Sequence, residues 1–281
     1  IVPSLMEQIE DYANNDILDR NTLWLLKGIG NLTELEKHEM QFEFFWVPSW
    51  QYNLPNEASR YYHYLHNKTM HNLTPETIMD DTLLPDNELF DLMVLYHLFQ
   101  ISPWYAEGRY DIDERDDTIM VLYDKFGGFT QTDLDYILAK QTSMLDELLG
   151  VYAEARDAGQ AEIITSPYSH PIMPLLMMPG WSNEQGRYIY KEAWYQDTVS
   201  HMGMAKDIYN EHFGEDPVGL WPSEQSVSED VIEPIADTGI KWMISDEMVL
   251  EKSGFEISDN NILCKPYIVE NNGKEIKIIF R

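Results

Sequence analysis

Hydrophobic side chains recur every three or four positions through the first part of the chain. This spacing occurs in residues 16–27, 33–45 and 88–99, and it predicts amphipathic helices there. Residues 48–55 are bounded by two prolines and are rich in aromatic side chains, which predicts a loop. Residues 1–129 are therefore expected to be mainly helical.

The pattern changes near residue 130, where Thr130-x-x-Asp133 starts a long helix. From there, long helices alternate with short apolar runs. Three times a helical pattern ends at a glycine, at Gly159, Gly214 and Gly239, where a left-handed helix end is typical. Each glycine is soon followed by a predicted buried strand, over residues 161–165, 218–221 and 240–245. Three successive helix–glycine–strand units indicate a parallel sheet and an α/β fold.

The last residues have the pattern of a β-hairpin. Two strand-like runs, 262–269 and 275–280, are separated by Asn271-Asn-Gly273, a sequence typical of a tight turn. The chain begins inside a helical pattern and stops on a strand, so we expect one partial domain that is truncated at both ends. Its expected parts are a helical portion (1–129), the helix–glycine–strand units (130–250) and a hairpin-like extension (251–281).

The chain is strongly acidic, with 19 Lys and Arg against 49 Asp and Glu and a net charge of −30. Such a field repels nucleic acids and anionic membranes, so neither is expected as a partner. It suits a neutral substrate or a cation, and a saline habitat would produce the same composition. Cys264 is the only cysteine, which excludes an internal disulfide and a cysteine-based zinc site.

No apolar run approaches the roughly 18 residues that a membrane span requires. The start of the chain does not resemble a signal peptide, because acidic residues interrupt its apolar pattern. The compartment stays open; for a prokaryotic protein, the cytoplasm is favoured over secretion.

Each predicted parallel strand has an acidic residue within it or just beyond it. Glu162 lies in the first strand, Glu224 follows the second, and Asp246-Glu247 follow the third. An aromatic or histidine side chain is close to each in sequence: His170, Trp221 and Trp242. Because the ends of such strands are where α/β folds place their chemistry, these residues predict one mouth rich in carboxylates and lined by aromatics. Cleavage of a glycosidic bond uses paired carboxylates of this kind.

The same residues allow other interpretations. Ser226-x-x-Glu229 predicts a capping box that opens a helix, so Glu224 could simply belong to a strand–helix loop. His170 and Asp246, with one more ligand, could hold a divalent metal ion, although no His-x-x-x-His or similar motif supports a metal site. Trp46, Trp50 and Tyr52 could form a sugar-stacking surface or could serve only in packing.

Two longer motifs resemble the second and third signature regions of family 57 glycoside hydrolases, most closely the amylopullulanase-like branch. The first is Gly159-Gln-Ala-Glu-Ile-Ile-Thr-Ser-Pro-Tyr-Ser-His-Pro-Ile-Met-Pro-Leu-Leu176, and the second is Gly219-Leu-Trp-Pro-Ser-Glu-Gln-Ser-Val-Ser228. The resemblance implies part of an incomplete (β/α)7 barrel of the glycoside hydrolase and deacetylase type. It also implies hydrolysis or transfer of α-glucans, at α-1,4 or α-1,6 linkages, with retention of configuration and without a cofactor or metal.

By this resemblance Glu224 is the expected nucleophile, and Glu162, His170 and Trp221 line the subsite of the reacting sugar. Asp246 matches an accessory acidic position. The family's first signature precedes this segment, and the signature with the general-acid aspartate has no match in it. We therefore expect the acid to come from remaining parts of the same catalytic domain, and the segment alone to be inactive. A non-catalytic carbohydrate-binding or scaffold protein is the alternative, and a metal-dependent polysaccharide hydrolase or deacetylase comes third.

Overall fold

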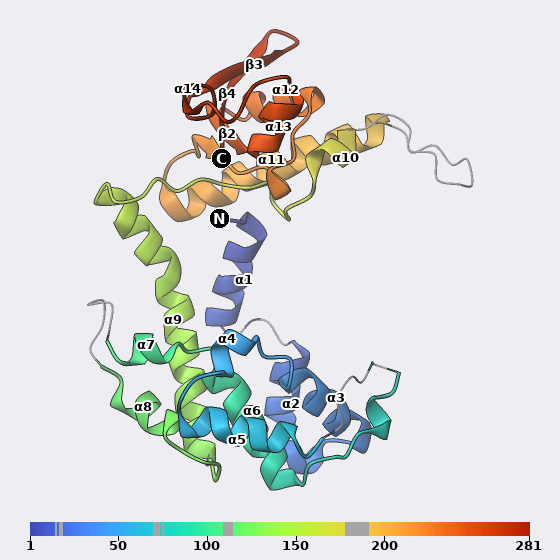
Figure 1. Ribbon diagram of the computed structural model, residues 1–281, viewed down its shortest axis with the longest axis vertical. Coiled ribbons are helices and arrows are strands. Elements are labelled where there is room, and N and C mark those ends of the chain that lie inside the picture. Colours follow the sequence, from blue (N-terminus) through green and yellow to red (C-terminus); the bar gives the residue numbers. More distant parts are fainter. Residues whose placement is uncertain (15, 17–18, 70–73, 75, 109–114, 178–190) are drawn as a thin grey trace. The chain divides into compact units, whose positions relative to one another are not determined.

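The structure, a computed structural model, describes residues 1–14, 16, 19–69, 74, 76–108, 115–177 and 191–281. It divides into two compact units (Figure 1). We call Tyr12–Leu145 the helical unit, and Ile1–Asp11 together with Asp146–Arg281 the sheet unit. Within the described part of the chain, every helix is too short or too polar to cross a bilayer.

The helical unit is built from helices of different lengths (Figure 1). Its elements are α2 (Arg20–Lys27), η1 (Ile29–Asn31), α3 (Glu34–Phe44), α4 (Ser49–Tyr52), α5 (Glu57–His66), η2 (Ile78–Asp80), α6 (Asp86–Leu98), α7 (Pro103–Ala106), α8 (Asp117–Tyr123) and the part of α9 (Gln131–Asp157) up to Leu145. The predicted helices at 16–27, 33–45 and 88–99 are confirmed as α2, α3 and α6, with residues 17 and 18 outside the described part. The loop predicted for 48–55 is wrong in its centre, where α4 forms a single helical turn.

Helix α6 is the centre of the helical unit and packs against α3 and α5. Its Asp91 is only 5% exposed, and a buried charge of this kind requires hydrogen bonds. Three groups supply them: Tyr61 Oη donates at 2.8 Å, the Gly128 amide at 3.0 Å and the Phe129 amide at 2.9 Å. Asp91 thereby holds the segment that leads into α9.

Helix α9 begins and ends as the sequence predicts. The Thr130 amide donates to Asp133 Oδ2 at 2.7 Å, and the Asp133 amide donates to Thr130 Oγ1 at 3.2 Å, which is a reciprocal capping box. At the other end Gly159 has a φ of 69°, so the left-handed helix end is confirmed. Gly214 and Gly239, after two later helices, have φ of 72° and 96° and confirm the same prediction.

The sheet unit combines a small sheet with helices (Figure 1). Its elements are α1 (Pro3–Ala13) up to Asp11, the rest of α9, α10 (Met173–Met177), α11 (Lys191–Phe213), β1 (Gly219–Leu220), η3 (Ser223–Gln225), η4 (Glu229–Val231), α12 (Ile232–Asp237), β2 (Trp242–Ser245), α13 (Glu247–Lys252), α14 (Asn260–Leu263), β3 (Tyr267–Asn271) and β4 (Lys274–Phe280). The mixed, helix-rich α/β class is thus confirmed, while closure into a barrel stays a prediction.

The sheet has the order β1-β2-β4-β3, in which β1, β2 and β4 are parallel and β3 is antiparallel to β4. The predicted parallel sheet is therefore confirmed. Residues 161–165 contribute less than a strand, since only Thr165 forms a parallel bridge, to Leu220. The predicted hairpin is also confirmed, and Asn272 and Gly273 occupy its turn with positive φ. The start of its first strand is wrong, because Asn260–Leu263 is the helical turn α14 and the strand begins only at Tyr267. The hairpin is more than an appendage, because β4 pairs with β2 and extends the parallel sheet.

Two clusters of buried side chains form the core of the sheet unit. Buried residues of the strands, including Leu220, Met243 and Ile278, pack in one cluster with buried side chains of α10 and α12. A second cluster joins Met6 of α1 to Tyr209 of α11 and their neighbours. Both clusters fix the strands whose ends carry the candidate site.

Candidate active site

Three chain segments leave the sheet at the same edge, the carboxyl end of the parallel strands. Thr165, Leu220, Met243 and Ile278 lie side by side in one row of the sheet. His170, Glu224 and Asp246 each follow this row by a few residues. Parallel strands therefore bring these three predicted site residues to one edge.

Glu224 lies in a strained turn immediately after β1. Its φ and ψ are 54° and 23°, and the φ of Gln225 is 56°, so two consecutive residues with side chains have left-handed backbone. This conformation costs roughly 1–2 kcal/mol per residue and persists where the surroundings enforce it, often at functional sites. Buried Ser245, the last residue of β2, is one such restraint, because its Oγ donates to the Gln225 carbonyl at 2.8 Å.

Polar atoms on both sides of Glu224 are buried without a partner. Ser223 Oγ, Gln225 Oε1 and Ser228 Oγ have no hydrogen bond to any described residue. The capping box predicted at Ser226 and Glu229 is wrong, because the helical turn starts at Glu229 with Ser228 in the cap position and receives no side-chain cap. An unpaired buried polar atom costs about 1–3 kcal/mol, so these groups are suited to a partner that binds beside Glu224.

The Glu224 side chain itself is exposed, and no hydrogen bond from the rest of the described chain restrains its carboxylate. The sequence predicts that it projects into an open cavity, and the exposure shows that the described residues do not enclose it. Trp221, three residues before Glu224, is half-buried, and its amide donates to the Thr165 carbonyl at 2.8 Å. This hydrogen bond fixes the backbone of Trp221 three residues before Glu224.

His170 is also held in a left-handed conformation, with a φ of 59°. Its loop is fixed from two helices: the Ser4 amide of α1 donates to the Tyr168 carbonyl, and the Tyr168 amide donates to the His201 carbonyl of α11. Tyr168 Oη also donates to Glu7 Oε2 at 2.7 Å. The only described left-handed residue with a side chain away from this sheet edge is in the hairpin turn.

Asp246 has a structural function at the edge. It is the N-cap of α13, and its Oδ1 accepts the Met248 amide at 2.7 Å. An N-cap aspartate at this position is common after a strand, so the acid alone does not indicate chemistry. Its predicted contact with substrate therefore depends on its neighbours rather than on a free carboxylate.

The structure contradicts the predicted position of Glu162. Because Thr165 is in register with Leu220, Glu162 lies before the paired row and Glu224 lies beyond it, at opposite ends of the strands. Glu162 precedes Thr165 by three residues, which adds to the separation. The Glu162 carboxylate instead accepts Trp242 Nε1 at 3.2 Å. Glu162 and Glu224 therefore do not share one rim, and a role of Glu162 in substrate binding stays a prediction.

Ser245 and the buried polar atoms around Glu224 were not among the residues predicted from sequence. A serine that ends a buried strand directly before an acid was the available signal, and its bond to the neighbouring turn depends on strand pairing. No group of three or more His, Cys, Asp or Glu side chains among the described residues is placed to hold a metal ion.

The fold and site together define an α/β protein with an exposed carboxylate on a strained turn, at the sheet edge where such folds place their chemistry. The sequence profile of Glycosyl hydrolase family 57 matches residues 33–281. The chain therefore belongs to this family, and the resemblance of its motifs is confirmed. A comparison with curated proteins finds no match.

Solved structures with similarity to the chain include three enzymes. The 4-alpha-glucanotransferase from Thermococcus litoralis is 19% identical, with a TM-score of 0.39, over 51% of this chain and 19% of that chain. The alpha-amylase AmyC from Thermotoga maritima is 13% identical, with a TM-score of 0.40, over 68% of this chain and 33% of that chain. The GH57-type branching enzyme from Pyrococcus horikoshii is 16% identical, with a TM-score of 0.38, over 70% of this chain and 34% of that chain. The chain thus spans at most about a third of the length of these three proteins.

Proposed function

We propose that this chain is part of the catalytic domain of a retaining enzyme that hydrolyses or transfers α-glucans, with Glu224 as the nucleophile. The observation that carries the proposal is the strained turn after β1, which presents Glu224 at the carboxyl edge of the sheet. Membership of Glycosyl hydrolase family 57 supports the reaction class.

In the proposed first step, Glu224 attacks the anomeric carbon of the sugar at the site. A carbon–oxygen bond forms between them as the glycosidic bond breaks, and a general acid protonates the departing oxygen. Water or the hydroxyl of an acceptor sugar then displaces Glu224, and the acid, now a base, accepts its proton. Two displacements restore the original configuration.

The general acid must lie about 5–5.5 Å from the nucleophile in such a mechanism. Asp246 is engaged as the cap of α13, which makes it a poor candidate for a residue that must exchange protons. We therefore assign the acid to remaining parts of the same catalytic domain, and we expect the segment alone to lack turnover.

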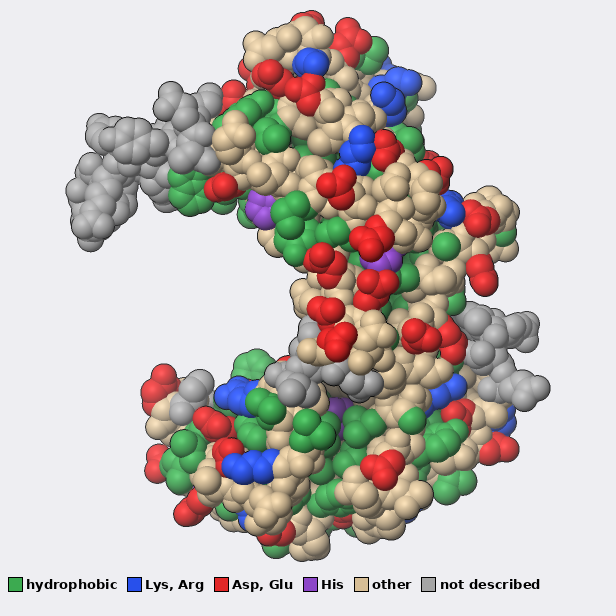
Figure 2. All heavy atoms as spheres, turned by 180° about the vertical axis from the view of Figure 1, so that it is seen from behind, with side chains coloured by type: hydrophobic (Ala, Val, Ile, Leu, Met, Phe, Trp, Pro, Cys, Tyr) green, Lys and Arg blue, Asp and Glu red, His purple; other side chains and the backbone are tan. Residues whose placement is uncertain are grey.

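Trp221, His170 and Asp246 would bind the sugar that Glu224 attacks. The half-buried Trp221 indole offers an apolar face for the C–H face of a hexose, and His170 and the second Asp246 oxygen can bond its hydroxyls. Ser223, Gln225 and Ser228 provide polar atoms that lack partners beside the nucleophile. The acidic surface, visible in Figure 2, favours a neutral ligand of this kind over a nucleic acid or an anionic membrane.

The direct test replaces Glu224 by glutamine in the full-length protein. Because the amide is isosteric but not nucleophilic, activity on starch or pullulan should fall at least about a thousandfold while the melting temperature stays unchanged. Glu229→Gln, an exposed residue of the same segment, is the matched control and should retain activity. Substantial turnover by the Glu224→Gln protein would refute the assignment.

The exposure of Glu224 favours a second candidate, a carbohydrate-binding role without catalysis. Calorimetry with maltooligosaccharides, run beside a reducing-sugar assay on the full-length protein, separates the two. Binding with no release of reducing ends or transfer products would favour the binding protein, whereas turnover supports the enzyme. For a metal-dependent hydrolase, activity would be lost in a chelator.

A further inference from the structure

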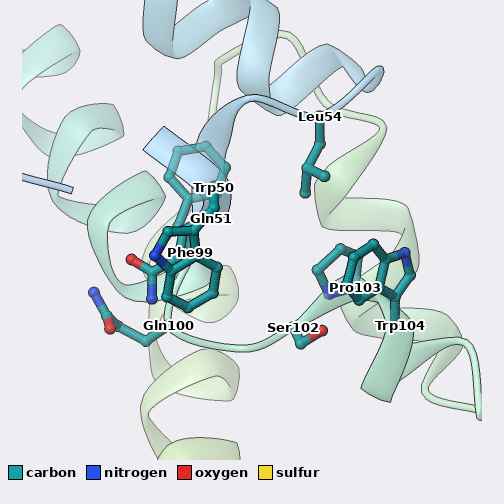
Figure 3. Close-up of a pocket in the computed structure, with 8 residues that line it drawn as sticks. All are labelled: Trp50, Gln51, Leu54, Phe99, Gln100, Ser102, Pro103 and Trp104. Atoms are coloured by element: carbon teal, nitrogen blue, oxygen red, sulfur yellow. The ribbon is translucent and has the colours of Figure 1, made fainter. Parts of the chain in front are cut away.

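The helical unit has a surface pocket that the proposed catalytic site does not use (Figure 3). It lies between α4 and the segment from the end of α6 to α7, and its volume is about 120 Å³. Its lining includes the aromatic and polar residues Trp50, Gln51, Phe99, Gln100, Ser102 and Trp104. All of them belong to the helical unit, whereas Glu224 belongs to the sheet unit.

Two tryptophans form opposite walls of this pocket (Figure 3). Trp50 is 73% exposed and Trp104 is 46% exposed, so neither indole is used to fill the core. Phe99, only 2% exposed, closes the pocket from the core side. Aromatic side chains bury 150–250 Å² when covered, so two exposed indoles that face one hollow favour a ligand between them.

The other aromatic residues of this region have packing partners, which separates them from Trp50. Tyr52 lies against Tyr62 with ring centroids 4.7 Å apart, and Trp46 lies against Phe42 at 6.0 Å. Of the three aromatics singled out in the sequence, Trp50 is thus the one whose ring faces the pocket.

Polar groups at the pocket have unused hydrogen-bonding capacity. Gln51 Oε1 is buried and has no partner among the described residues. Ser102 occupies the N-cap position of α7 without capping it, and Gln100 uses only its Nε2, in a long bond to the Tyr96 carbonyl. None of the described residues that line the pocket is charged. The ligand it suits is therefore neutral, with one apolar face and several hydroxyl groups.

A pyranose ring has these properties, because its C–H face stacks on an indole while its hydroxyls bond amides and serine. The volume is well below the roughly 300–1,000 Å³ of a site that encloses a whole small ligand, so it suits one unit of a longer chain. We infer that this pocket is a non-catalytic binding site for one glucose unit of an α-glucan polymer, an inference that rests on the proposed function. A second attachment point raises the apparent affinity for a polymer without a new catalytic contact.

The test uses the full-length protein carrying Glu224→Gln, so that the polymer is not consumed. Mobility in native gels that contain amylopectin measures retention by the polymer. Trp50→Ala and Trp104→Ala should each weaken retention about tenfold, which is the size expected for loss of a central aromatic contact. Trp46→Ala is the matched control, since Trp46 is 74% exposed but lies outside the pocket, and it should be retained normally.

A second measurement separates this inference from the proposed function. With Glu224 intact, the tryptophan variants should lose kcat/KM on amylopectin and keep it on maltotetraose, whose few glucose units are held by the catalytic subsites alone. Residual turnover by the Glu224→Gln protein would refute the nucleophile, whatever the tryptophan variants do. Unchanged retention of Trp50→Ala and Trp104→Ala would overturn the glucose site even if Glu224→Gln is inactive.

Two further variants guard against misfolding as an explanation. Gln51→Leu removes the unpaired buried oxygen, so it should maintain or raise the melting temperature and still weaken retention by amylopectin. Ser102→Ala should likewise weaken retention by amylopectin without lowering the melting temperature. If the tryptophan variants lose binding only of an apolar dye such as anilinonaphthalene sulfonate, while amylopectin is still retained, the pocket serves another ligand and the inference is wrong.

Discussion

Gly219 is the residue on which the close packing of the first strands depends. A Cβ at this position would lie 2.6 Å from Ile164 Cγ2 and 2.6 Å from Trp242 Cζ2. The Trp242 indole crosses the strand here and donates to Glu162, so it cannot move away without loss of that bond. Gly219→Ala should therefore lower the free energy of unfolding of the sheet unit by about 1–3 kcal/mol, measured by urea denaturation.

Gly203→Ala is the control for this prediction, because Gly203 lies inside α11 with no atom within 4 Å of the added Cβ. Alanine is favoured over glycine in a helix by roughly 1 kcal/mol, so this variant should be at least as stable as the parent. Equal stability of Gly219→Ala and the parent protein would contradict the packing described for β1.

His97 makes the helical unit sensitive to acid. Burial lowers the pKa of His97 to about 4. Among the described residues, the ring forms one hydrogen bond, from Nδ1 to Gln141 Oε1, and its Nε2 has no hydrogen-bond partner. The unfolded chain takes up the proton near pH 6.5 and the folded chain does not, so stability falls as the pH drops from about 6.5 to about 4. The expected loss between about pH 7 and pH 5 is about 2 kcal/mol.

Urea denaturation of the helical unit at both pH values measures this effect. In His97→Gln the difference in free energy of unfolding between the two pH values should be smaller, even though this variant is less stable at neutral pH. His63→Gln, at an exposed position of α5, should keep the full dependence. If the free energy of unfolding changes equally with pH in the parent and both variants, His97 is not the group responsible.

At the scale of elements, local signals determined what the sequence could predict. The helix ends at Gly159, Gly214 and Gly239 are correct because a left-handed glycine is a property of one residue. The helix start predicted at Thr130 is correct and the capping box predicted at Ser226 is wrong, since the second lies in a segment held by tertiary contacts.

The pairing of β4 with β2 could not be predicted, because a strand's neighbour is set by packing across the chain. The same limit applied to the site. The motifs identified Glu224 and His170 as candidates, and both lie at one edge of the sheet. The spacing of residues does not predict strand register, which places Glu162 before the paired row. The pocket between Trp50 and Trp104 could not be predicted from sequence either, since its walls come from two separate helices.

The bond between β2 and the Glu224 turn yields a prediction for a positioning residue. Ser245→Ala removes the Ser245 Oγ bond to the Gln225 carbonyl. In the full-length enzyme kcat should fall about tenfold, because small displacements of a reacting group are costly, while KM changes little. Ser245→Thr, which keeps the hydroxyl, should recover most of kcat.

Ser253→Ala serves as the comparison for Ser245, since Ser253 Oγ makes an equivalent 2.8 Å bond to the Val249 carbonyl on the exposed side of α13. Both alanine variants should lose a similar 0.5–1.5 kcal/mol or so of stability, but only Ser245→Ala should lose kcat. If the two variants have the same kcat, the bond does not position Glu224.

For the whole molecule, the net charge of −30 is the dominant property. Acidic side chains are spread over the face in Figure 2, so repulsion among them opposes the folded state. Salt screens such repulsion, with a Debye length of about 30 Å at 0.01 M and about 3 Å at 1 M. Added NaCl should therefore raise the midpoint of thermal unfolding by about 3 °C or more. KCl should act equally, and a midpoint that is insensitive to both salts would contradict this account.

The central claim is that Glu224 forms a covalent bond to the sugar during the reaction. The full-length enzyme can be incubated with 5-fluoro-α-glucosyl fluoride, which slows breakdown of a glycosyl-enzyme, and its peptides can then be analysed by mass spectrometry. We predict one added fluoroglucosyl group, on Glu224. A group on a different carboxylate, or turnover of the reagent with inversion and no labelled peptide, would contradict the claim.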